Sequence, residues 1–208
     1  MPRSGWAVIC MEQKYITTSE LFGALPNEQK AEALASELEK IPAVSERARK
    51  IMGIKNAQGR AESLAGLYLL SQMTDLSSKE LIYPEGEKPY LLGGPEFSIS
   101  HSHGFAVCVT DESPVGVDTE LLRRIADAER LAKRYFSDKE KEKMLSFADQ
   151  NEAFLRIWTK KEALFKLGGD PKITDIRKVD TESANAIFEE STVTIGGKTY
   201  LITVCRNQ

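Results

Sequence analysis

The middle of the chain constrains the fold most, because three short apolar runs follow one another there with only turn residues between them. The runs are EFSIS at 96–100, FAVCVTD at 105–111 and VGVDTEL at 115–121. Each has the length and composition of a strand, and the polar HSHG and SP segments between them are typical of turns. Sequential antiparallel strands are therefore expected in this region.

Helical patterns flank these strands on both sides. Apolar residues recur at helical spacing through 19–73 and again through 123–167, where Ser137 and Glu140 have the spacing of a capping box. WAVICM, at 6–11, is a short strand candidate, and the last segment, STVTIGGKTYLITVC, alternates like a hairpin turning at Gly196–Gly197. This order predicts an α+β protein of two related subdomains, residues 1–112 and 113–208.

Composition excludes several classes of protein. The 208 residues are 41% hydrophobic and 28% charged with a net charge of -3, which argues neither for nucleic acid nor for a membrane surface. Cys10, Cys108 and Cys205 lie far apart in apolar runs, so buried thiols are expected rather than zinc ligands or disulfides. The N-terminus is too short and too polar for a signal peptide, and the expected location is the cytoplasm.

Asp118 and Glu120 lie two residues apart in the third strand, so both side chains project from one face. Adjacent carboxylates near a core raise each other's pKa unless a cation holds them. A hard divalent ion such as Mg²⁺, which takes oxygen ligands, would relieve the repulsion. The alternative is a solvated strand end, and for an isolated pair of this kind that alternative is favoured.

WTKKEALFK, at 158–166, is a second candidate for chemistry. On a helix Trp158, Glu162 and Lys166 share one face, with Lys161 turned about 100° from Glu162. The tryptophan can form one wall of a binding site, the glutamate can act as a metal ligand or general base, and the lysine can provide a cation for phosphate. The alternative, favoured when the segment is taken alone, is a core tryptophan beside a surface ion pair.

SISHSHG, at 98–104, holds the only two histidines, His101 and His103. Hydroxyls and imidazoles before a glycine offer donors for an anionic oxygen, whereas the lack of a third nitrogen or thiolate ligand argues against zinc. An exposed turn is the alternative for His103. The N-terminal half also carries basic residues that either cover a solvated helix face or meet phosphates. They are Arg47, Arg49, Lys50, Lys55, Arg60 and Lys88.

In order, the segments KPY, FSISHS, VGVDTE, KRYFSDKE and WTKKEALFK resemble the 4'-phosphopantetheinyl transferase superfamily in its long, surfactin-synthetase-activator type. The resemblance implies a pseudo-dimer of two similar α/β subdomains with mainly antiparallel sheets and coenzyme A in the cleft between them. It also implies transfer of the 4'-phosphopantetheine arm of coenzyme A to a serine of an apo acyl or peptidyl carrier protein, which releases adenosine 3',5'-bisphosphate.

Carried over position by position, the resemblance makes Asp118, Glu120 and Glu162 the Mg²⁺ ligands. Glu162 is also the candidate base, and Lys166 assists at the pyrophosphate. Ser100 and His101 are expected at the phosphates, Lys88 and Pro89 by the nucleotide, and Arg60 by the 3'-phosphate; Arg47 and Lys50 align only with a gap. The residues assigned to coenzyme A are Arg47, Lys50, Arg60, Lys88, Pro89, Ser100, His101 and Lys161.

The sequence departs from the family pattern at Thr119, where an aliphatic residue is usual, and at Glu87 and Tyr135. The chain is also short for the long type, which puts substrate breadth in doubt. The expected partner is a carrier protein with an acidic helix, facing Arg123, Arg124 and Lys133 unless these merely solvate a helix. No nucleic acid or membrane partner is expected, and a monomer suffices. Two alternatives remain: a metal-dependent coenzyme A phosphohydrolase and a non-catalytic coenzyme A-binding protein.

Overall fold

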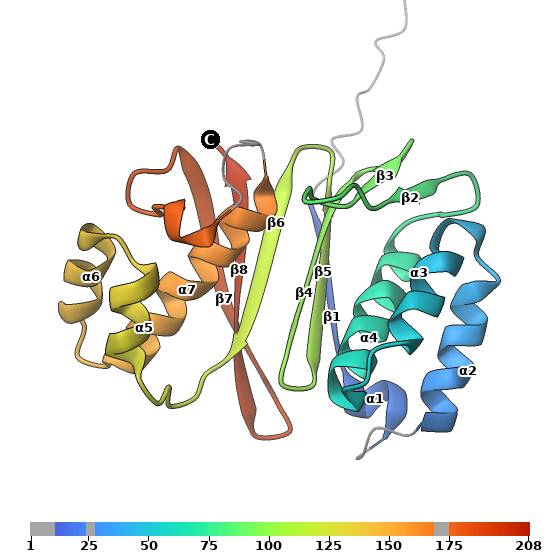
Figure 1. Ribbon diagram of the computed structural model, residues 1–208, viewed down its shortest axis with the longest axis horizontal. Coiled ribbons are helices and arrows are strands. Elements are labelled where there is room, and N and C mark those ends of the chain that lie inside the picture. Colours follow the sequence, from blue (N-terminus) through green and yellow to red (C-terminus); the bar gives the residue numbers. More distant parts are fainter. Residues whose placement is uncertain (1–10, 24–27, 169–174) are drawn as a thin grey trace, which may run out of the picture.

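The computed structural model describes residues 11–23, 28–168 and 175–208 and contains two sheet-bearing subdomains that lie side by side (Figure 1). In spatial order, the N-terminal sheet contains β1 (Glu12–Thr17), β5 (Phe105–Asp111) and β4 (Glu96–Ser102). The C-terminal sheet contains β6 (Val115–Leu121), β8 (Lys198–Asn207) and β7 (Ala186–Ile195). All of these pairs are antiparallel, which confirms the predicted α+β class.

Helices cover the outer face of each sheet, so the layers run helix, sheet, sheet, helix (Figure 1). The N-terminal helices are α1 (Thr18–Phe22), α2 (Glu28–Glu39), α3 (Pro42–Met52) and α4 (Ala57–Met73). A small hairpin, β2 (Glu80–Ile82) and β3 (Tyr90–Leu92), follows them. The C-terminal helices are α5 (Ala128–Tyr135), α6 (Asp138–Leu145), α7 (Gln150–Leu167) and the short 3₁₀ helix Ile176–Lys178.

The third predicted strand, β6, does not continue the antiparallel series of β4 and β5, and this expectation was wrong. It pairs with β8 over seven residues, from Val115 opposite Arg206 to Leu121 opposite Tyr200. A run of apolar residues defines a strand but not its partner, and here the partner lies at the other end of the chain. The predicted boundary between residues 112 and 113 falls in the link between β5 and β6.

Local signals place several elements correctly. Ser137 caps α6, since its Oγ accepts from the amide of Glu140 and the Glu140 side chain returns to the Ser137 amide, forming the predicted capping box. Gly196 and Gly197 have φ of 57° and 76°, the left-handed conformations that a two-residue hairpin turn requires. Of the strand candidate at 6–11, only Met11 lies within the described residues.

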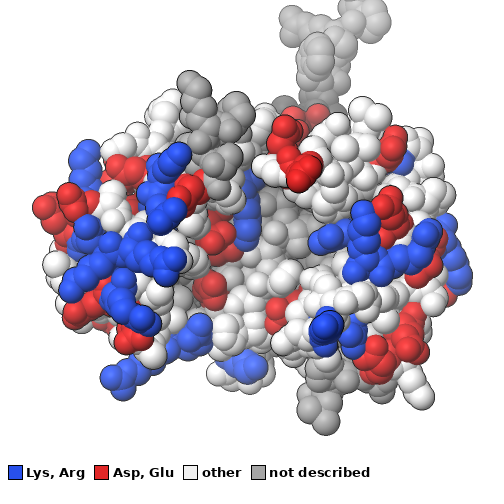
Figure 2. All heavy atoms as spheres, in the orientation of Figure 1, with Lys and Arg blue, Asp and Glu red and all other residues white. Residues whose placement is uncertain are grey.

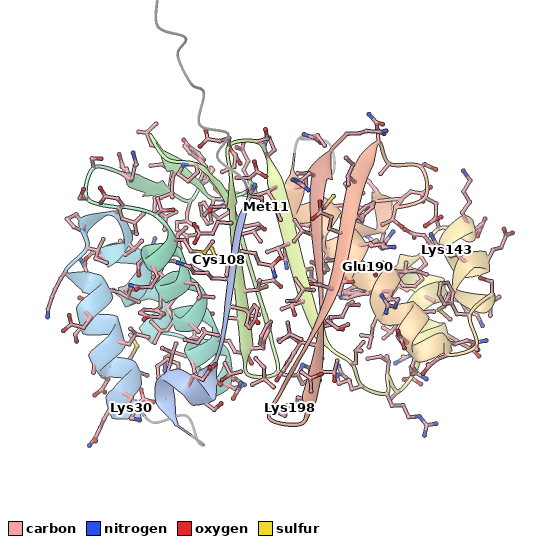
Figure 3. All side chains as sticks on the ribbon, turned by 180° about the vertical axis from the view of Figure 1, so that it is seen from behind. Met11, Lys30, Cys108, Lys143, Glu190 and Lys198 are labelled. Carbon is pink, nitrogen blue, oxygen red and sulfur yellow. The ribbon has the colours of Figure 1, made fainter. Side chains whose placement is uncertain are left out.

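The two sheets face each other across an apolar layer, which Figure 3 shows from behind as side chains filling the space between them. Phe105, Val107 and Val117 are fully buried there, and the rings of Phe105 and Tyr200 stack with centroids 4.5 Å apart. Burying such a side chain contributes about 1.5–3 kcal/mol, so this layer holds the two subdomains together.

Cys108 and Cys205 are buried, as predicted, whereas Cys10 lies outside the described residues. Cys108 belongs to the core between the N-terminal sheet and its helices (Figure 3). Among the helices that the structure describes, none combines the length and the apolar character needed to cross a membrane.

Candidate functional site at the junction of the two sheets

Three serines of β4 join the N-terminal sheet to β6. Ser98, Ser100 and Ser102 lie two residues apart and share one strand face. Backbone amides of β6 donate to the first two hydroxyls at 3.0 and 3.3 Å, and Ser102 Oγ donates to Glu120 Oε2 at 2.8 Å. Side-chain hydroxyls thus take the place of a backbone ladder between the edges of two sheets, and they fix the position of the acids on β6.

Asp118 lies at the centre of this junction and is only 4% exposed. Its Oδ1 accepts from Ser100 Oγ at 2.7 Å and from Lys166 Nζ at 2.6 Å, and Lys166 Nζ also donates to Ser100 Oγ at 3.0 Å. Its Oδ2 is buried without a hydrogen-bond partner. A buried carboxylate oxygen of this kind is costly unless another group binds it.

Gly116 explains how α7 reaches these acids. A Cβ at this position would lie 2.0 Å from the carbonyl oxygen of Ala163 and 2.5 Å from the amide nitrogen of Leu167. Only glycine lets the backbone of α7 pack this closely on β6. The close approach brings Lys166 to Asp118, so the glycine of the VGVDTE segment determines the geometry of the site.

The site carries excess negative charge. Burial raises the pKa of Glu120, partly opposed by the hydrogen bond from Ser102 and reinforced by the charge of Asp118. Burial also raises the pKa of Glu162, which Lys166 lowers and the two β6 acids raise further. These electrostatic couplings show that the acids of β6 and α7 share one environment, as the sequence predicts.

Lys166 is the cation that contacts this acidic group, through its ion pair with Asp118. Within the three described stretches of chain, no three His, Cys, Asp or Glu side chains form a ready-made metal cluster. The oxygen-only donor set and the partnerless Oδ2 of Asp118 nevertheless fit a hard divalent cation. The assignment of Asp118, Glu120 and Glu162 as ligands stays a prediction.

Lys88 reaches this junction from the segment before β3. Its Nζ donates to the carbonyl oxygen of Val115 at 2.8 Å and to Glu96 Oε2 at 3.2 Å. Burial lowers the pKa of Lys88, and the charge of Glu96 opposes that shift. Pro89 follows it and is half-buried. Lys88 therefore lies where the N-terminal subdomain meets the beginning of β6.

His101 points to the opposite face of β4 from Ser100, toward α4. Its Nδ1 lies 3.2 Å from Glu62 Oε2 and its Nε2 lies 3.4 Å from Ser63 Oγ. Glu62 is a residue that the sequence reasoning missed. The feature that could have pointed to it is a glutamate among the apolar residues of the buried face of α4, next to Ala61.

Lys161 does not lie in the site, so its predicted contact with the phosphates of coenzyme A was wrong. The side chain is 0% exposed and its Nζ donates to Glu140 Oε2 at 2.8 Å and to the carbonyl oxygen of Val179. The turn of about 100° from Glu162 directs Lys161 toward α6 instead of β6. Trp158 likewise packs in the core, stacked on Phe154.

The other basic residues lie on the helices of the N-terminal subdomain. The guanidinium of Arg47 lies over the ring of Tyr83 at 4.7 Å. Lys50 Nζ lies 2.6 Å from Glu46 Oε1, and Arg60 pairs with Glu28. None of these contacts reaches the acidic group, and the assigned roles of Arg47, Lys50 and Arg60 stay predictions.

Comparison with known proteins identifies a family whose model matches the part of the chain that contains β6 and α7. Residues 114–204, which span the acids of β6 and all of α7, match the family model described as the 4'-phosphopantetheinyl transferase superfamily. This segment is thus similar to that superfamily, and the resemblance predicted from the motifs is confirmed.

Particular relatives share 30–42% identity with parts of the chain. The 4'-phosphopantetheinyl transferase HetI of Nostoc sp. is 42% identical over 77 residues, 36% of this chain and 32% of HetI. AcpT of Salmonella typhi is 37% identical over 115 residues, 53% of this chain and 59% of AcpT. Sfp of Bacillus subtilis strain 168 is 30% identical over 107 residues, 49% of this chain and 47% of Sfp. The chain thus covers less than two thirds of the length of each of these relatives.

Proposed function

We propose that this protein transfers the 4'-phosphopantetheine arm of coenzyme A to a serine of an apo acyl or peptidyl carrier protein. The products are the holo carrier protein and adenosine 3',5'-bisphosphate. The observation that supports this most is the junction at which Asp118, Glu120, Glu162 and Lys166 share one environment between the two subdomains. In Figure 2 a furrow runs between the two lobes, with acidic and basic side chains along its walls.

In this proposal residues 1–112 and 113–208 are two subdomains with the active site in the cleft between them. The C-terminal subdomain supplies the acids and Lys166, while the N-terminal subdomain supplies Ser100, His101 and Lys88 for the phosphates and nucleotide of coenzyme A. The hydrogen bonds of Ser100 to Asp118 and of Lys88 to the Val115 carbonyl oxygen support it, because both cross from one subdomain to the other.

Mg²⁺ is the cation we propose for the acids, with Asp118, Glu120 and Glu162 as the residues that would hold it. The supporting observations are the oxygen donors, the partnerless buried Oδ2 of Asp118 and the pKa-raising repulsion among the carboxylates. When bound, Mg²⁺ supplies polarisation of a phosphoryl oxygen and neutralises negative charge at the pyrophosphate.

In the transfer step the carrier serine Oγ forms a bond to the β-phosphorus of coenzyme A. The bond from that phosphorus to the bridging oxygen breaks, and adenosine 3',5'-bisphosphate leaves. Glu162 accepts the serine proton, directly or through a water. Lys166 supplies positive charge where negative charge accumulates on the leaving group.

The carrier protein is proposed to dock at α5 with its acidic helix. Arg123, Arg124 and Lys133 are exposed, and Figure 2 shows Lys and Arg side chains gathered over the lobe that carries α5 and α6. Arg124 and Lys133 also line a cavity of about 510 Å³ beside α5. This cavity is separate from the acids, so it fits a docking surface better than the reaction centre. No second copy of the chain is needed, and we propose a monomer.

Product analysis distinguishes the transferase from a coenzyme A phosphohydrolase. The protein is incubated with coenzyme A and MgCl₂, with and without an apo carrier protein, and adenosine 3',5'-bisphosphate is quantified. We expect release only with the apo carrier, and no release with a carrier whose acceptor serine is alanine. Release at the same rate without a carrier would instead indicate hydrolysis, and a complete lack of release with several apo carriers would favour a binding protein.

A further inference from the structure

Glu62 is a buried acid outside the acidic group on β6 and α7. It is 7% exposed, and its Oε1 accepts from the amide of Gly104 at 2.6 Å and from Gln58 Nε2 at 2.7 Å. Its Oε2 faces Nδ1 of His101 at 3.2 Å. One carboxylate thus contacts both the imidazole and the turn that follows it.

The protonation of this pair follows from the contacts. Burial raises the pKa of Glu62, but hydrogen bonds from His101, Gln58 and the Gly104 amide outweigh it and lower that pKa below its ordinary value. An ionised carboxylate only accepts hydrogen bonds. At 3.2 Å from Glu62 Oε2, Nδ1 of His101 can form a hydrogen bond to the carboxylate only when it carries a proton, and Nε2 is the nitrogen left for other partners.

The turn after His101 is held from both subdomains, which limits how the imidazole can move. The amide of Thr18 donates to the Gly104 carbonyl oxygen at 2.8 Å, and Tyr200 Oη on β8 donates to the His103 carbonyl oxygen at 3.0 Å. Gly104 has a φ of 88°, a conformation that favours glycine.

We infer that Glu62 is a positioning residue, which holds His101 with its proton on Nδ1 and presents Nε2 to an anionic oxygen of the ligand. The identity of that oxygen, a phosphate of coenzyme A, rests on the proposed function. When His101 is doubly protonated, its Nε2–H donates to the phosphate while Glu62 compensates the positive charge. Such a charge-assisted hydrogen bond is about twice as strong as a neutral one.

The variant Glu62→Gln tests the inference with almost no change of shape. The Gly104 amide can only donate, so the glutamine must keep its oxygen there and direct its NH₂ group toward His101. Nδ1 then has to accept, and the proton of the neutral ring moves to Nε2. The matched control Ser63→Ala removes the partner near Nε2 and should leave the proton on Nδ1.

Imidazole ¹⁵N and ¹³C chemical shifts report the tautomer at a pH at which the ring is neutral. The chain has two histidines, so His103→Gln assigns the signals. We expect Nδ1–H in the wild type and in Ser63→Ala, and Nε2–H in Glu62→Gln. Nε2–H in the wild type would overturn the inference even if the variant failed to fold, and so would an unchanged tautomer in folded Glu62→Gln.

Binding of coenzyme A, measured by calorimetry, provides the second readout. Loss of the charged partner should weaken binding about tenfold in Glu62→Gln, because the hydrogen bond to the phosphate becomes a neutral one. Equal affinity of wild type and variant would contradict the role of His101 at the anion. If the wild type bound no coenzyme A while the tautomer still changed, the proposed function would fail and the positioning of His101 by Glu62 would stand.

Discussion

Replacing Gly116 by alanine tests how the site is built. The added Cβ would lie 2.0 Å from the Ala163 carbonyl oxygen, and Cβ atoms essentially never come within 3.0 Å of a non-bonded heavy atom. The atoms in the way belong to the backbone of α7 and cannot rotate aside, so α7 must withdraw from β6 by at least about 1 Å. Overpacking of this kind costs about 1–3 kcal/mol in the free energy of unfolding.

The same movement carries Lys166 and Glu162 away from Asp118. A displacement of about 1 Å in a catalytic arrangement lowers the rate by about 10²-fold. We therefore expect Gly116→Ala to lose both stability and the proposed transferase activity, in contrast to a variant that removes one proposed ligand and keeps the fold.

Urea unfolding followed by circular dichroism measures the first effect, and a transfer assay with saturating coenzyme A measures the second. A loss of 2 kcal/mol lowers the urea midpoint by about 1 M when the slope is about 2 kcal/mol/M. The matched control is Gly59→Ala in α4, where the added Cβ meets Asn56 at an ordinary 3.6 Å. It should raise stability by about 0.5–1 kcal/mol. An unchanged midpoint and rate in Gly116→Ala would refute the close approach of α7 to β6.

Three further changes have expected outcomes. Lys161→Met leaves a buried carboxylate unpaired and should cost about 3–5 kcal/mol in urea unfolding; an unchanged midpoint would contradict the buried pair. Glu120 and Glu162 have raised pKa values in the folded protein. Their ionisation therefore lowers the stability of the fold as the pH rises from the ordinary glutamate pKa through the raised values. MgCl₂ should thus raise Tm at neutral pH by several degrees in the wild type but not in Asp118→Ala, and equal Tm changes would argue against this site. Thr119→Val loses a hydrogen bond to a backbone carbonyl oxygen, so we expect a loss of about 1 kcal/mol with near-normal turnover; a large loss of turnover would contradict its place away from the acids.

The sequence was sufficient where the cause of a structure is local. Strand periodicity placed Asp118 and Glu120 on one face, and the Ser137 capping box and the Gly196–Gly197 turn depend on residues within a few positions. Helical spacing likewise placed Glu162 and Lys166 on one face of α7, whereas the meeting of that face with the β6 acids was implied only by the family resemblance.

Contacts between distant segments were beyond the sequence patterns. The pairing of β6 with β8 joins residues 79 to 91 positions apart, and no local pattern specifies it. Lys161 and Lys166 lie on the same helix with the same charge, yet only the packing of α6 and β6 around α7 decides that the first is buried and the second meets Asp118. The contact of Glu62 with His101 spans 39 positions and has the same cause.

The proposed function makes the β6 acids and α7 the centre of a phosphopantetheinyl transfer reaction. Intact-protein mass spectrometry of apo carrier proteins, incubated with coenzyme A, MgCl₂ and either wild type or Asp118→Ala, tests it most directly. We expect a gain of one phosphopantetheine mass on the acceptor serine with the wild type, and none with Asp118→Ala, whose circular dichroism spectrum should match the wild type. Modification of the carrier by folded Asp118→Ala at the wild-type rate, or no modification by the wild type of any acyl or peptidyl carrier, would contradict the proposed function.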